Sequence, residues 1–115
     1  MKKIILINWI NEINDFNYIK DLDNVYINWD LYLSDNNLTE FNYNKSINWD
    51  LYLSYNKLTE FNYNHTTNWG LYLHNNNLTE FNYNKYINWD LYLYLNNLKI
   101  KKQDLKCKVK NSIYL

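Results

Sequence analysis

Several residue types are missing from this chain, or nearly so. Its 115 residues include no alanine, no arginine and no proline, one glycine, Gly70, and one cysteine, Cys107. A single cysteine cannot form an internal disulfide and is too few for a zinc cluster. A single glycine cannot build a glycine-rich phosphate-binding loop. The chain is instead rich in asparagine, tyrosine, isoleucine and lysine, which is typical of coding by an AT-rich genome.

An excess of charge and a long apolar run are also absent. Lysine and the acids number 12 each, so the formal net charge is zero, which argues against a nucleic-acid partner. No stretch approaches the ~20 apolar residues of a membrane-spanning helix, so we expect no membrane partner. The apolar run 4–7 ends at Asn8 without a small-residue cleavage site, unlike a signal peptide. We therefore expect a soluble, intracellular, cytoplasmic protein, and 47% hydrophobic residues are enough for a core.

What is present is a 20-residue repeat. The segments 27–44 and 47–64 differ at two of eighteen positions, and the five tryptophans lie 20 residues apart, at Trp9, Trp29, Trp49, Trp69 and Trp89. Self-similarity at this period marks a repeat architecture. The predicted organisation is an atypical N-terminal coil, four repeats and a lysine-rich C-terminal cap, with the boundaries 1–25, 26–45, 46–65, 66–85, 86–98 and 99–115.

Each repeat alternates like a half-buried strand. Trp49, Leu51 and Leu53 fall on one face of such a strand, and Tyr52 falls on the other. A second extended piece follows at 58–63, and the apolar positions do not fit a helical period. One unit cannot bury its apolar face alone, whereas stacked units can. The predicted fold is mainly β: a short parallel β-solenoid of four to five coils with little or no helix.

A family resemblance rests on the run Leu51-x-Leu53-x-x-Asn56-x-Leu58. It resembles the core of a leucine-rich repeat, and it recurs in register in four units over 27–98. The resemblance implies that asparagines inside the bend bond the backbone of their own and neighbouring coils; the alternative is that they only mark a left-handed turn. These are Asn36, Asn56, Asn76 and Asn96. Because the family's first leucine falls on asparagine in each unit, we expect the adjacent tryptophans to point inward: Trp29, Trp49, Trp69 and Trp89.

No constellation of residues for catalysis emerges. His65 and His74 are predicted to lie on the surface, and Cys107 is predicted to be a small core residue. No Cys/His or Ser/His/acid pairing is present, so we expect no enzyme, no cofactor and no metal. Three acids occupy the same position in their repeats, and Gly70 interrupts this column: Asp30, Asp50 and Asp90. They are either solvated strand residues or paired carboxylates that serve acid–base chemistry or bind calcium.

The outward face of the strands is the best candidate for function. Stacked tyrosines offer rigid, amphipathic contact area, and the family resemblance implies that this face binds partners. We therefore expect a non-enzymatic protein-interaction module with an unknown protein partner. The alternatives are a glycan-binding solenoid, a self-assembling or neutral product of repeat expansion that stacks end to end, and tyrosines that only stabilise the sheet. The candidate residues are Asp30, Tyr32, Asp50, Tyr52, Tyr55, Tyr72, His74, Tyr92 and Tyr94.

The C-terminal end differs from the repeats in charge. Residues 99–115 carry six lysines and one acid, a local charge of +5. Leu105, Cys107 and Val109 alternate with lysines, which is the pattern of a lysine-protected edge strand.

Overall fold

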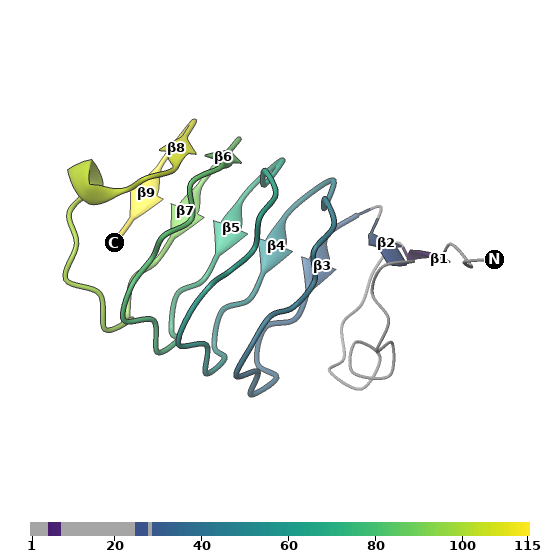
Figure 1. Ribbon diagram of the computed structural model, residues 1–115, viewed down its shortest axis with the longest axis horizontal. Helices are drawn as coiled ribbons and strands as arrows, with labels where there is room; N and C mark the ends of the chain where they lie inside the picture. Colours follow the sequence, from purple (N-terminus) through teal and green to yellow (C-terminus); the bar gives the residue numbers. More distant parts are fainter. Residues whose placement is uncertain (1–4, 8–24, 28) are drawn as a thin grey trace.

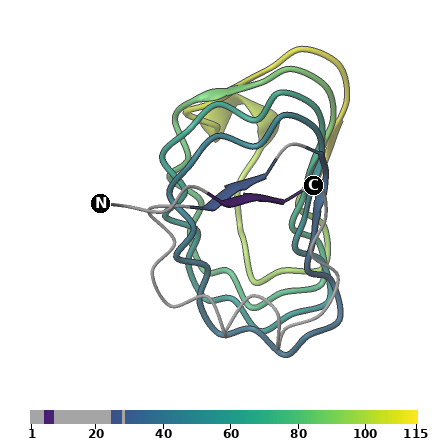
Figure 2. The same ribbon diagram turned by 90° about the vertical axis from the view of Figure 1, so that its right-hand side faces the viewer.

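The chain winds into a stack of coils. The computed structural model describes residues 5–7, 25–27 and 29–115. Strand follows strand at steps of about 20 residues, and the only helical turn in the described part is the short 3₁₀ helix η2 (Lys102–Asp104). Figure 1 shows the coils side by side, and Figure 2, turned by 90°, shows their outlines nearly superposed. The prediction of a mainly β, parallel solenoid is confirmed.

One wall of the stack is a parallel sheet of five very short strands. Its order follows the chain, from β3 (Leu31–Tyr32) through β4 (Leu51–Tyr52), β5 (Leu71–Tyr72) and β7 (Leu91–Tyr92) to β9 (Ile113–Tyr114). The register pairs like with like, leucine with leucine and tyrosine with tyrosine, up to β7. Inter-coil hydrogen bonds continue past each strand, so that the ladder is longer than two residues.

Two smaller parallel pairs complete the strand inventory of the described residues. β1 (Ile5–Ile7) pairs with β2 (Val25–Ile27), and β6 (Tyr86–Ile87) pairs with β8 (Lys108–Val109). The expected N-terminal coil, 1–25, lies mostly outside the described residues. At the other end Cys107 is buried in the core, and the lysines that alternate with it are exposed.

The core consists of columns of identical side chains. Leu51 and Leu53 are fully buried, as are their counterparts one coil away. Phenylalanines from the second half of each coil stack at 6.2 Å between ring centroids, from Phe41 to Phe61 to Phe81. Such burial of apolar area contributes roughly 25 cal/mol per Å². Repetition therefore gives each coil the same interior that its neighbours have.

An asparagine ladder lies inside the bend that follows each strand. The Asn56 Oδ1 accepts hydrogen bonds from the backbone N–H groups of Asn36 and Leu38, both at 3.0 Å. Its Nδ2 donates to the carbonyl oxygens of Leu33, in the preceding coil, at 2.9 Å, and of Leu53, in its own coil, at 3.0 Å. Asn76 and Asn96 repeat this pattern. One short amide thus satisfies buried donors and acceptors of two coils at once.

The prediction that the tryptophans point inward is wrong. The exposed fractions of Trp29, Trp49, Trp69 and Trp89 lie between 38% and 50%. The inward position is taken two residues earlier in each unit, by side chains at most 2% exposed: Ile27, Ile47, Thr67 and Ile87. A bend at residues 48–49 causes the difference, because it breaks the alternation between the inward residue 47 and the strand.

Candidate functional site: the tyrosine face of the sheet

A continuous column of five tyrosines runs along the outward face of the sheet. Neighbouring ring centroids lie 4.4–4.7 Å apart. The parallel register of the strands places one ring in each coil at the same height, which brings residues 20 or more positions apart into stacking contact. The members of this tyrosine column are Tyr32, Tyr52, Tyr72, Tyr92 and Tyr114.

Stacking determines which atoms of the column a partner can reach. From Tyr52 onward the interplanar angles between neighbours are 11–21°, so each inner ring is covered on both faces by its neighbours. The inner part of the column therefore presents ring edges, not ring faces, to the outside. Exposure is greatest at its two ends, 47% for Tyr32 and 43% for Tyr114, and the three inner rings are half-buried.

An acidic ladder runs beside the tyrosine column. The Asp30 Oδ1 accepts a hydrogen bond from the Asp50 N–H at 2.8 Å, and the Asp50 Oδ1 accepts one from the Gly70 N–H at 2.6 Å. The Tyr52 hydroxyl donates to the Asp50 Oδ2 at 3.2 Å. Burial of the Asp50 carboxyl raises its pKa, although the Gly70 N–H acts in the opposite direction, and the charge of Asp30 raises it further. The carboxylates therefore stabilise the coil edge and also add acceptor oxygens to the face.

Asp90 departs from the expectation of a solvated strand acid. It is 8% exposed, and its Oδ1 accepts hydrogen bonds from the Asn111 Nδ2 at 2.7 Å and the Ser112 N–H at 3.0 Å. These bonds tie the last repeat to the segment before β9. Among the described residues no group of three or more His, Cys, Asp or Glu side chains could hold a metal ion.

Gly70 interrupts the acidic ladder and makes room for a tyrosine. A Cβ atom at Gly70 would lie 2.7 Å from Cε2 of Tyr72 and 2.8 Å from its hydroxyl oxygen. The Tyr72 ring thus occupies the space of the missing side chain. Burial raises the pKa of Tyr72 to about 12, and the charge of Asp50 adds to this shift.

His74, Tyr55 and Tyr94 form an aromatic cluster at the far end of the strands. The His74 ring stacks on Tyr94 at 4.7 Å and meets the edge of Tyr55 at 5.5 Å. His74 is half-buried rather than freely exposed, and burial lowers its pKa. Tyr55 is 52% exposed and has a φ of 56°, a left-handed conformation that is strained for a bulky residue. The structure therefore brings three of the predicted face residues, from the segments after β4, β5 and β7, into one contact network.

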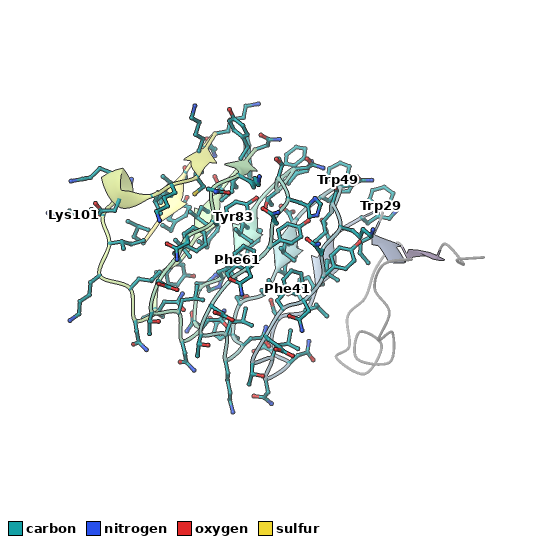
Figure 3. The ribbon with its side chains drawn as sticks, viewed as in Figure 1. Trp29, Phe41, Trp49, Phe61, Tyr83 and Lys101 are labelled. Atoms are coloured by element: carbon teal, nitrogen blue, oxygen red, sulfur yellow. The ribbon has the colours of Figure 1, made fainter. Side chains whose placement is uncertain are left out.

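The tryptophans form a second exposed aromatic column that the sequence interpretation missed. Trp29, Trp49 and Trp69 stack at 5.7 and 5.3 Å between centroids, and Trp89 follows at 5.8 Å with a tilted ring. In Figure 3, Trp29 and Trp49 lie side by side on the outer edge of the coils, whereas Phe41 and Phe61 lie within them. The available signal was the isoleucine two positions before three of these tryptophans, which competes for the inward position.

Comparison with protein-family models, with curated proteins and with solved structures finds no match to this chain. No helix in the described part of the chain is long and apolar enough to cross a membrane.

Proposed function

We propose that the chain is a non-enzymatic protein-interaction module that binds a partner through the tyrosine face. The observation that carries this proposal is the column of five tyrosines, whose neighbouring ring centroids are held 4.4–4.7 Å apart. A stacked array is already ordered before binding, so little conformational entropy is lost on contact. Tyrosine is also enriched at interfaces because its ring and hydroxyl supply apolar and polar contact together.

The chemistry of the face favours a partner rich in hydrogen-bond donors. The Tyr52 hydroxyl lies beside the carboxylate of Asp50, and the Asp30 carboxylate is bonded to the Asp50 N–H. The segments 30–34, 50–54, 70–74 and 90–94 carry no lysine. Opposite potentials across an interface favour association and suppress wrong partners. We therefore infer a protein surface that bears lysine or arginine side chains.

The glycan alternative fits the geometry less well. Sugar rings stack on the open faces of aromatic side chains, but the inner tyrosines are covered on both faces by their neighbours. Trp49 likewise has a ring on each side. The family resemblance to leucine-rich repeats remains part of the proposal, and the asparagine ladder within the bend supports it.

Selection from a library of short random peptides tests the proposal. We expect peptides enriched in lysine and arginine, and we expect their amide-shift perturbations to map to β3, β4, β5 and β7. The double variant Tyr52→Ser/Tyr72→Ser is expected to bind them at least tenfold more weakly. Tyr52→Phe/Tyr72→Phe, which keeps the stack and removes the hydroxyls, is expected to weaken binding to a smaller extent.

A matched control is Asn42→Ser/Asn62→Ser, because both asparagines are exposed and lie outside the sheet. This variant is expected to bind the peptides as the wild type does. Unchanged affinity in the serine double variant, with its dichroism intact, would contradict the proposal. Perturbations that map to the opposite wall of the coils would contradict it too.

A further inference from the structure

Lysines gather around a small pocket where β6 meets β8. The pocket has a volume of about 110 Å³ and is lined by Asn84, Lys85, Tyr86, Lys106 and Lys108. The pairing of β6 with β8 brings these residues together, because Tyr86 lies opposite Lys108 and the Lys108 N–H bonds the Lys85 carbonyl oxygen at 3.4 Å. Figure 3 shows side chains ending in nitrogen around this end of the coils.

Two of the three ammonium groups have a contact with a neighbouring side chain. The Lys106 Nζ donates a hydrogen bond to the Asn82 Oδ1 at 3.2 Å. The Lys108 Nζ lies 5.8 Å from the centroid of the Tyr86 ring, within reach of a cation–π attraction. Lys85, the third, is half-buried. Lysines of two adjacent coils therefore line one cavity.

Among the described residues, no carboxylate lines this pocket. Its lining contains no acid, and in the described part of the chain none of its three lysines forms an ion pair. The one acid of the segment 99–115, Asp104, is engaged elsewhere, since its Oδ2 accepts the Lys101 N–H at 2.8 Å. Like charges that line one cavity repel one another, so a bound anion would stabilise the arrangement.

We propose that this pocket binds an oxyanion of the phosphate type. Three ammonium groups, an amide and a phenol can all donate hydrogen bonds, and phosphate oxygens accept several such charge-assisted bonds at once. The volume is more than three times the ~30 Å³ of a water molecule in the liquid, which is room for a group of a few heavy atoms. This site lies apart from the tyrosine face and does not depend on the function proposed for it.

A titration of the isotope-labelled chain with inorganic phosphate at constant ionic strength tests the proposal. We expect saturable shifts of the amides of residues 84–86 and 106–108. Lys85→Gln, Lys106→Gln and Lys108→Gln are each expected to weaken binding about three- to tenfold. Glutamine keeps most of the aliphatic side chain and a hydrogen-bond donor, so the pairing of β6 with β8 is expected to persist. Circular dichroism of each variant checks that the fold is retained.

Lys102→Gln is the matched control, since Lys102 is an exposed lysine of the same basic segment outside the pocket. It is expected to leave the affinity unchanged. Phosphoserine separates the two sources of the ligand chemistry: binding of both supports a free or an esterified phosphate, and binding of phosphoserine alone supports a phosphorylated molecule. Shifts that stay linear with both ligands, or equal losses in Lys102→Gln and Lys108→Gln, would overturn the proposal.

Discussion

At the scale of single residues, buried asparagines stabilise this fold although their side chains are polar. Asn56 is 7% exposed, and its amide bonds backbone groups of two coils. The motif and the bend position are visible in the sequence. That each amide bonds the backbone of two neighbouring coils is visible only in the structure, because it depends on the distance between the coils.

Asn56→Ala is expected to lower the free energy of unfolding by at least about 3 kcal/mol. It leaves the N–H groups of Asn36 and Leu38 and the carbonyl oxygen of Leu33 without their side-chain partner, and each unsatisfied buried group costs about 1–3 kcal/mol. Asn62→Ala, at an exposed position, should change it by no more than about 0.5 kcal/mol. Urea unfolding measures both, and equal losses would contradict the ladder.

The buried tyrosines predict a dependence on alkaline pH. Burial raises the pKa of Tyr83 and the pKa of Tyr72 to about 12, against about 10 in the unfolded chain. A raised pKa in the fold means that the stability these groups contribute is complete below pH 10 and is lost as the pH rises through 12. Tyrosinate absorbance at pH 11 should therefore be lower in the folded chain than in urea. Equal absorbance would show that these hydroxyls are open to solvent.

At the scale of the element, alternation predicted the strands but not the segment before them. Leu51 and Leu53 point inward and Tyr52 points outward, as period-two spacing requires. The same spacing applied to Trp49 failed, because the bend at 48–49 shifts the phase and Ile47 fills the core. Hydrophobicity alone could not decide between tryptophan and isoleucine at this corner.

The corrected orientation of the tryptophans has a direct consequence for mutations. Leu51→Ala empties a fully buried position and is expected to cost about 2–5 kcal/mol. Trp49→Ser removes a larger but 38% exposed side chain and its two stacking contacts, so its expected cost is about 1–3 kcal/mol. Thermal unfolding of the two variants compares them. A greater loss of stability in Trp49→Ser than in Leu51→Ala would support the inward orientation of the tryptophan instead.

At the scale of the whole molecule, identical coils extend every surface feature into a line. The leucines, phenylalanines and asparagines form inward lines, and the tyrosines and tryptophans form outward lines. The repeat itself was evident from the sequence. The sequence did not show which side chains stack along each column. That depends on the rise from coil to coil and on the angle of each corner, which are properties of the folded backbone.

The C-terminal end of the stack predicts the state of association. The strands β8 and β9 have two residues each, β8 itself contains Lys108, and Lys110 follows it. Short edges and lysines oppose strand-to-strand joining. Light scattering after size exclusion should therefore find one species of 14.3 kDa at every concentration. A mass that grows with concentration would favour end-to-end assembly as the function.

The central claim is that the tyrosine face is a binding surface on a scaffold stabilised from inside. The most direct test compares the urea unfolding of Tyr52→Ser/Tyr72→Ser with that of Asn56→Ala/Asn76→Ala. The tyrosine pair should stay folded and lose about 2–4 kcal/mol, from three stacking contacts. The expected loss for Asn56→Ala alone is at least about 3 kcal/mol. The asparagine pair should therefore lose at least about 6 kcal/mol of unfolding free energy. Unfolding of the tyrosine pair, or a loss equal to that of the asparagine pair, would show that the column is structural.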